Sequence, residues 1–90
     1  MDFIIEMNEI YLLNQDNIKI AYVKFPKIND YLVEVTSTYV SETLRGQGVA
    51  GKLMNILYDE LKRTNRKAKM KCSYAVTWFD KNVEKQDIFG

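Results

Sequence analysis

Short runs of β-branched and aromatic residues dominate the first part of the chain. Residues 3–13 and 18–25 form two such runs, and the polar residues 14–17 separate them. Runs of this composition favour strands, and a polar cluster between two of them favours a turn. The pattern therefore predicts an antiparallel hairpin over residues 3–25.

A third strand is expected after Pro26. Proline lacks a backbone N–H and fixes φ, so it ends the second strand, and the polar residues 27–30 supply a turn. Over residues 31–40 polar and apolar positions alternate, with Val33 and Val35 on one face. A period of two is that of a strand, so residues 31–40 are predicted to form the third strand.

The pattern becomes helical after the third strand. Residues 48–63 carry apolar side chains at three- and four-residue spacing, at Val49, Leu53, Ile56, Leu57 and Leu61. This spacing predicts one buried helical face. A short strand ending near Cys72 then alternates apolar residues with lysines, a second helix is predicted over residues 74–82, and residues 84–90 form a tail.

The predicted order of elements is β-β-β-α-β-α. This order describes an α+β domain in which an antiparallel sheet is extended by a helical crossover. Ninety residues fit a single domain, residues 1–90, and a hydrophobic fraction of 47% supports a thin core. A deep, enclosed active site is not expected in so small a domain.

The residue types exclude several kinds of chemistry. Histidine is absent and Cys72 is the single cysteine, so Ser-His-Asp catalysis, Cys-His catalysis, an internal disulfide and a structural zinc site are ruled out. The net charge is only +1, and the basic stretch at residues 62–71 contains no aromatic residue. We therefore expect no nucleic-acid partner. No signal-peptide pattern or membrane-length apolar run is present, which favours a cytoplasmic protein without a membrane partner.

Three of the four glycines lie where the third predicted strand leads into the first turn of the first predicted helix, at Gly46, Gly48 and Gly51. Glycines permit sharp turns and close approach to a ligand, and a helix start presents unpaired N–H groups. The arrangement suits a phosphate, although glycines also serve helix starts for the turn alone. Leu53 follows Lys52 where a P-loop requires Ser or Thr, so the segment is not a P-loop.

The segment Arg45-Gly46-Gln47-Gly48-Val49-Ala50 resembles the R/Q-x-x-G-x-G/A motif of the GNAT-type N-acetyltransferases. In that family the motif follows a strand, opens a helix and holds the pyrophosphate of acetyl-CoA on backbone N–H groups. The family's downstream frame N-x-x-A-x-x-Φ-Y-x-K is similar to residues 72–81. The combination looks like a short branch of the family that lacks the usual N-terminal helices, and the resemblance extends over residues 31–89.

The resemblance implies a set of residues that bind acetyl-CoA. These are Tyr39, Val40, Arg45, Gly46, Gln47, Gly48, Val49, Ala50, Gly51 and Lys52. The backbone amides of residues 47–51 would hold the pyrophosphate, with Arg45 at the mouth of the cradle and Lys52 within reach of a phosphate. The strand edge at Tyr39 and Val40 would pair with the pantetheine arm.

The resemblance also implies that any catalytic apparatus differs from the family's usual one. Phe79 and Cys72 stand where the frame usually has Tyr and Asn, and Ser37 stands where the short branch commonly has His. Phenylalanine cannot donate a proton, so Cys72 is the candidate catalytic residue, as an acetyl acceptor or a catalytic thiol. The alternative role for Cys72 is that of a small buried hydrophobe.

These observations together predict a protein that binds acetyl-CoA and transfers its acetyl group to an amine of unspecified identity. No metal is expected to take part, and the protein is expected to be a monomer or a weak homodimer. The alternative hypothesis is a module without catalytic activity that binds CoA, acetyl-CoA or a partner protein.

Overall fold

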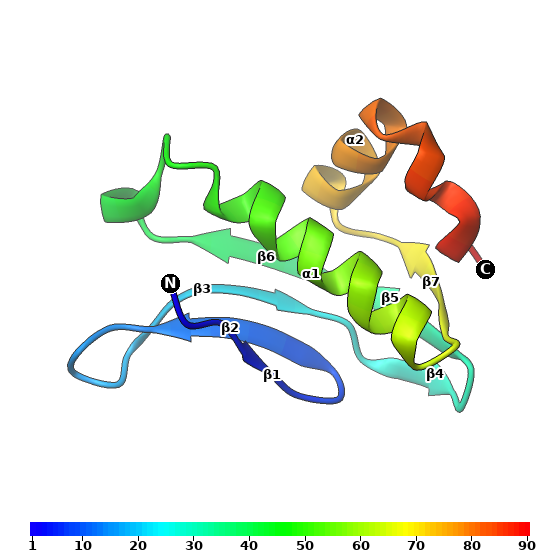
Figure 1. The fold of residues 1–90 in the computed structure, drawn as a ribbon, viewed down its shortest axis with the longest axis horizontal. Coiled ribbons are helices and arrows are strands. Elements are labelled where there is room, and N and C mark those ends of the chain that lie inside the picture. The colour runs from blue at the N-terminus through cyan, green and yellow to red at the C-terminus, as the bar shows by residue number, and fades with distance from the viewer.

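The computed structural model describes residues 1–90, and its helices α1 and α2 lie on the same side of two adjoining sheets (Figure 1). The larger sheet contains, in spatial order, β1 (Ile4–Ile5), β2 (Glu9–Leu13), β3 (Lys19–Lys24) and β6 (Ser37–Val40). The smaller sheet contains β4 (Lys27–Asn29), β5 (Leu32–Val35) and β7 (Lys67–Met70). The helical elements are η1 (Glu42–Leu44), α1 (Val49–Arg63), α2 (Ser73–Lys81) and η2 (Val83–Ile88).

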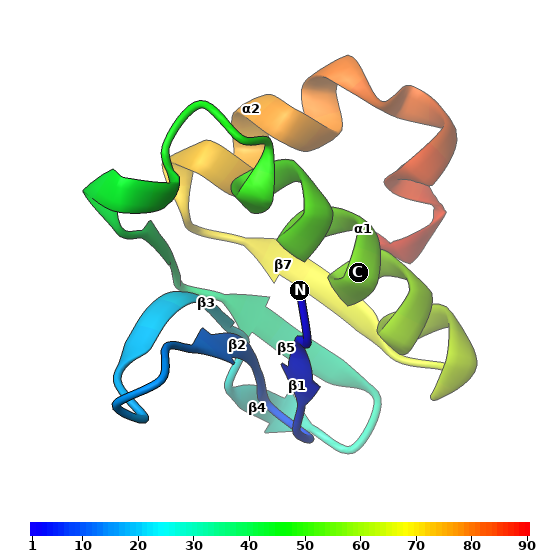
Figure 2. The same ribbon diagram turned by 60° about the vertical axis from the view of Figure 1, so that its left-hand side comes forward.

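One core joins the helices to both sheets, and α1 lies over them with its axis roughly along β7 (Figure 2). The predicted face of α1 is confirmed, because Val49, Leu53, Leu57 and Leu61 are buried. Ile56, on the flank of that face, is only partly buried. The amphipathic pattern of α1 therefore fixes which side of the helix meets the sheets.

The predicted third strand is one strand in sequence but two in the structure. It is interrupted at Thr36, and its halves, β5 and β6, belong to different sheets. β5 pairs with β7 in parallel, whereas β6 pairs with β3 in the antiparallel sense. The two sheets separate at this interruption, so β6 has a hydrogen-bonded neighbour on one edge only. Its other edge is open.

Several predicted boundaries are corrected by the structure. Residues 3–13 form two strands, β1 and β2, because a turn closed by the bond from the Glu6 N–H to the Glu9 carbonyl (2.8 Å) folds the chain back on itself. Residues 27–30, predicted as a turn, include β4. Most of the predicted tail forms η2. The predicted α+β class with a mainly antiparallel sheet is confirmed.

The remaining correction concerns Cys72. It does not lie within the strand predicted to end near it, since β7 ends at Met70 and Cys72 is the N-cap of α2. The prediction that it points with the apolar residues is confirmed, because its side chain packs against the core. Neither helix has the length and apolar composition that a membrane span requires.

Candidate functional site

The chain turns sharply between β6 and the start of α1. Gly46 and Gly48 have φ of +82° and +74°, in the left-handed region that glycine adopts without strain. No neighbouring atom lies within 4 Å of the place where a Cβ would stand at either position. Backbone conformation, and not crowding, therefore requires glycine there, and the space in front of both residues is open.

This turn leaves a group of backbone N–H donors without partners inside the protein. They belong to Gly46, Gly48, Val49, Ala50 and Gly51. Gly48 is the N-cap of α1 and has no side chain with which to cap the helix. The first N–H groups of a helix also carry the positive end of its dipole. The start of α1 is consequently a set of free donors suited to an anion.

A shallow pocket of about 210 Å³ is formed over these donors. Its lining consists of Val40, Leu44, Arg45, Gly46, Gly48, Val49, Ala50, Gly51 and Tyr74. The Arg45 side chain curls back across the turn, where its Nε donates a hydrogen bond to the Val40 carbonyl at 3.3 Å. The pocket thus combines a guanidinium group, free backbone donors and the end of an edge strand.

Two residues of the predicted cradle do not line the pocket. The N–H of Gln47 bonds to the Leu44 carbonyl at 3.3 Å, and its side-chain Nε2 bonds to the Thr43 carbonyl at 3.3 Å. Lys52 lies in the first turn of α1 with its side chain exposed to solvent. The structure therefore brings Arg45 and the glycines together but leaves Gln47 and Lys52 outside the wall.

Tyr74 was not among the site residues predicted from the sequence, yet it forms part of the pocket wall. It lies in the first turn of α2, two positions after Cys72. Burial raises the pKa of its phenol, so the hydroxyl group keeps its proton at neutral pH. The feature of the sequence that could have identified Tyr74 is the segment Cys72-Ser73-Tyr74, at the predicted start of the second helix.

The open edge of β6 connects the pocket to Cys72. The N–H of Ser41 bonds to the Ile20 carbonyl on β3, so the backbone groups of Thr38 and Val40, at alternate positions, point away from β3. Val40 lies in the pocket wall, and Thr38 is hydrogen-bonded to Cys72. Two residues of strand span roughly 7 Å. The thiol and the anion pocket therefore lie along one strand edge.

The side chain of Tyr39, between these two residues, lies on the other face of the larger sheet from Val40. Tyr39 is 42% exposed, and its ring packs against the ring of Tyr22, with centroids 5.4 Å apart. The backbone N–H and carbonyl of Tyr39 point toward β3, where Tyr39 is paired with Tyr22. Tyr39 was predicted to meet a pantetheine arm, but it presents neither its backbone groups nor its ring to the open edge.

Cys72 is held at the start of α2, with its sulfur against β6. The distance from Cys72 Sγ to Thr38 Oγ1 is 3.4 Å. Burial is the largest single influence on this thiol and raises its pKa. Hydrogen bonds with the Thr38 hydroxyl and with the N–H groups of Ala75, Tyr74 and Thr38 outweigh burial, so the pKa of Cys72 falls below its ordinary value. The arrangement favours a thiolate.

Phe79 cannot take part in proton transfer at this site. Its side chain is fully buried and makes edge contacts with the rings of Trp78 and Phe89, at centroid distances of 4.9 and 5.7 Å. Ser37 is partly buried on β6, one residue before Thr38. No group of three or more acidic or cysteine side chains is arranged to hold a metal ion.

A model of the GCN5-related N-acetyl-transferase family matches residues 9–88, so the chain belongs to this family. The structure is similar to the solution structure of a GCN5-like protein from Staphylococcus aureus, with a TM-score of 0.80 and 25% identity. That match covers 99% of this chain and 87% of the other. None of the curated proteins compared with the chain matches it.

Larger members of the family share the fold at lower identity. Tetrahymena GCN5 is 18% identical with a TM-score of 0.62, covering 87% of this chain and 48% of that one. A GNAT family acetyltransferase from Elizabethkingia anophelis, solved with acetyl-CoA bound, is 15% identical with a TM-score of 0.61, covering 83% and 51%. The chain spans about half the length of these two proteins.

Proposed function

We propose that this protein binds acetyl-CoA at the start of α1 and transfers the acetyl group to an amine. The observation that carries the proposal is the set of unpartnered backbone N–H groups from Gly46 to Gly51, in a turn that requires glycine at two positions. A pyrophosphate offers several oxygens at once, and converging backbone donors at a helix start are suited to it.

Residues beyond the free donors would complete the binding of acetyl-CoA. Arg45, at the rim of the pocket, would contact a phosphate through guanidinium N–H groups that Val40 does not use. Lys52, just outside the wall, would meet the outer phosphate oxygens, whereas the backbone N–H of Gln47 is already bonded to the Leu44 carbonyl. The open edge of β6, where the backbone groups of Thr38 and Val40 point away from β3, would pair with the amides of the pantetheine arm. When bound, acetyl-CoA supplies an acetyl group activated as a thioester.

The position of Cys72 favours a route in which it carries the acetyl group. Its thiolate attacks the thioester carbonyl, a bond to Cys72 Sγ forms, and the bond to the CoA sulfur breaks. The CoA sulfur takes up the proton that Cys72 had given to solvent. An amine then attacks S-acetyl-Cys72, forms the amide, loses its proton to solvent and restores the thiolate. The N–H of Thr38 and the first N–H groups of α2 are available to stabilise negative charge.

Direct attack by the amine on the thioester is the other route. In that case Cys72 packs beside the site and never carries the acetyl group. Incubation with acetyl-CoA followed by intact-mass analysis separates the two routes, with Cys72→Ala as the control. Gain of one acetyl group by the wild type and none by Cys72→Ala is expected. A wild-type protein that transfers acetyl groups but never gains one itself would contradict the covalent route.

Thr38 is proposed as the residue that positions and stabilises the Cys72 thiolate. Substitution Thr38→Val removes the hydroxyl beside Sγ and keeps the backbone N–H, so we expect the pKa of Cys72 to rise. The rate of Cys72 alkylation as a function of pH measures this change. Thr38→Ser keeps the hydroxyl and should behave like the wild type. An unchanged pH midpoint in Thr38→Val would remove Thr38 from the mechanism.

Binding itself is tested by thermal unfolding with acetyl-CoA, CoA and ATP. A ligand at 100 times its Kd adds about 2.7 kcal/mol of stability. In a domain of this size that corresponds to a rise in Tm of about 10 °C or more. We expect acetyl-CoA and CoA to raise Tm and ATP to have a smaller effect. No rise with either CoA compound would contradict the proposal.

A binding module without catalytic activity is the second candidate function. The observation that favours it is Phe79, which is buried and aromatic where the family's frame usually has a proton-donating tyrosine. Such a module would raise its Tm with CoA but would not transfer acetyl groups. Cofactor-dependent acetylation of any member of a mixed panel of amines by the purified protein would reject this candidate.

A further inference from the structure

The largest hollow of the molecule lies at the other end of α1 from the glycine turn. It has a volume of about 580 Å³ and lies between the turn that joins β1 to β2, strand β4 and the end of α1. α1 contains 15 residues, and a helix rises about 1.5 Å per residue, so its two ends are roughly 22 Å apart. This second pocket is therefore separate from the proposed acetyl-CoA site.

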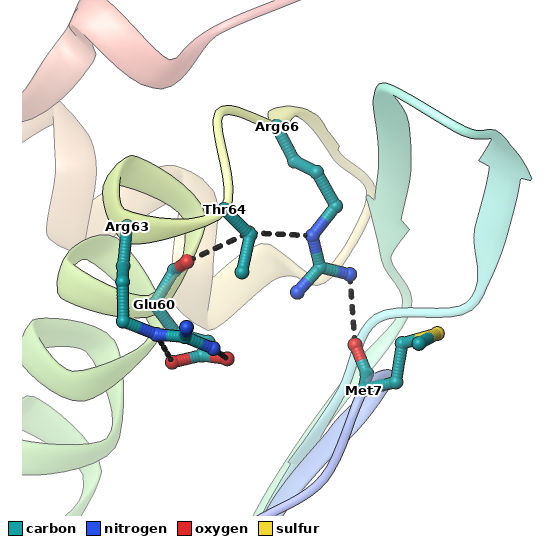
Figure 3. Close-up of polar contacts among 5 residues, drawn as sticks. All are labelled: Met7, Glu60, Arg63, Thr64 and Arg66. Carbon is teal, nitrogen blue, oxygen red and sulfur yellow. Dashed lines mark hydrogen bonds and ion pairs between the residues drawn. The ribbon is translucent and has the colours of Figure 1, made fainter.

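Arg66 is anchored in the wall of this pocket (Figure 3). Its Nε donates to Thr64 Oγ1 at 2.8 Å, and its Nη1 donates to the Met7 carbonyl at 2.8 Å. The guanidinium carbon also lies 5.7 Å from the centre of the Phe25 ring. The residue is only 9% exposed. These contacts fix the orientation of the guanidinium group before any ligand arrives.

The third nitrogen of this guanidinium group, Nη2, makes no hydrogen bond within the protein. No buried side-chain nitrogen or oxygen lacks a partner, so Nη2 reaches the accessible surface, and Arg66 is one of the residues that line the pocket. A buried, oriented arginine with free N–H groups is suited to an anion with planar oxygens.

Most of the other charged side chains that line this pocket are already paired within the protein. Glu60 accepts two hydrogen bonds from Arg63, at 3.0 and 2.6 Å. Lys27 is paired with Asp30 at 3.0 Å. Arg66 is the positive group of this wall that is not paired with a carboxylate. A singly charged anion fits better than a phosphate dianion, because the nearby carboxylates repel the larger charge.

We propose that this pocket binds a small molecule through a carboxylate group, with Arg66 as its anchor. The carboxylate accepts hydrogen bonds from the free N–H groups of Arg66. The polar side chains of Asn8 and Asn29, which also line the pocket, lie where the remainder of a polar ligand would be held. A volume of about 580 Å³ is within the range of small-molecule sites.

The test uses N-acetylglycine, which carries one carboxylate, and N-acetylglycinamide, which is its uncharged counterpart. The full chain is labelled with ¹⁵N, and the Nε–H signal of Arg66 is followed by NMR during each titration. We expect a saturable shift of this signal, and of the amides of Thr64 and Met7, with the acid only. Equal responses to the amide or to matched sodium chloride, or no response, would overturn the proposal.

A substitution at Arg66 separates its role in ligand recognition from its role in folding. Arg66→Lys keeps the charge but not the planar group, and we expect it to bind N-acetylglycine about tenfold more weakly or worse. Lys81→Gln, at an exposed position of α2 outside this pocket, is the control for loss of a positive charge and should keep the wild-type affinity. An Arg66→Lys protein that is folded and binds equally well would overturn the role of Arg66. If Arg66→Lys does not fold, the wild-type titration still decides the proposal.

Discussion

Each end of α1 has backbone polar groups that lack a partner within the helix, and the two ends differ in how these groups are satisfied. At the C-terminal end the chain satisfies its own carbonyl groups: the N–H groups of Arg66 and Asn65 bond to the carbonyls of Leu61 and Lys62, at 2.9 and 3.2 Å. Asn65 has φ of +55°, the left-handed turn of a Schellman motif. At the N-terminal end the free N–H groups meet no partner.

The charges at the two ends sharpen this contrast. Lys62 and Arg63 lie in the last turn, where cations complement the helix dipole, but no acidic residue lies in the first turn. The usual N-cap residues, Ser, Thr, Asp and Asn, are replaced by Gly48. The comparison teaches that the polar groups of one end are satisfied within the protein, whereas the other end keeps free donors that are suited to an anion.

The largest effect on stability is expected from a substitution at the C-terminal end of α1. Arg66→Ala removes two charge-assisted hydrogen bonds and leaves the Met7 carbonyl without its donor. We expect a loss of about 2–4 kcal/mol in the free energy of unfolding, measured by urea denaturation. Arg63→Ala, which removes a largely exposed side chain, should cost clearly less. Equal costs for the two variants would contradict this view of the C-terminal end.

The next effect concerns the open end. Gly48→Ala forces a left-handed φ on a residue with a Cβ, which costs about 1–2 kcal/mol. The new methyl group would also stand in the space in front of the free donors. We expect the rise in Tm caused by acetyl-CoA to be lost or strongly reduced. A variant that is destabilised but keeps the full rise would show that the ligand does not approach this turn.

A smaller effect follows from the ionisation of Glu60. Hydrogen bonds from Arg63 are the main reason that the pKa of this carboxyl is lowered in the folded protein. A lowered pKa contributes stability that is present above the unfolded pKa and is lost as pH falls through the folded pKa. Because Arg63 is largely exposed, we expect Glu60→Gln to cost about 1 kcal/mol or less at pH 7. The cost should shrink on acidification below about pH 4, and a cost independent of pH would contradict it.

The smallest effect is expected at Gly51. A Cβ there would meet only Trp78 Nε1, at an ordinary contact distance of 3.5 Å. Alanine is also a better helix former than glycine, so Gly51→Ala should be neutral or stabilise the protein by roughly 0.5 kcal/mol. The variant keeps the backbone N–H and should keep the rise in Tm with acetyl-CoA. It is therefore the matched control for Gly48→Ala.

The features that follow from local sequence were predictable. The three- and four-residue spacing that ends at Leu61 fixed the buried face of α1, and the glycine cluster located its open end. The division of the third strand was not predictable, because the alternation of Val33 and Val35 lies wholly within β5 and says nothing about Thr36, where the strand is interrupted. The parallel pairing of β5 with β7 is a tertiary feature that local periodicity does not encode.

The same distinction holds for the sites. The sequence placed Cys72 at the end of a strand and just before a helix, but its contact with Thr38 joins residues 34 positions apart. The bond between Arg66 and Met7 spans 59 positions. Such contacts depend on how the two sheets separate and on where α1 ends, so the Arg66 pocket has no signal in the sequence.

The central claim is that the N-terminal end of α1 is open in order to bind the pyrophosphate of acetyl-CoA. The most direct measurement is a ¹H–¹⁵N NMR titration of the backbone amides with acetyl-CoA. We expect the signals of Gly46, Gly48, Val49, Ala50 and Gly51 to shift together and saturably, while those of Asn65 and Arg66 remain unchanged. Shifts that are absent from the glycine turn, or that appear only at the C-terminal end of α1, would contradict the claim.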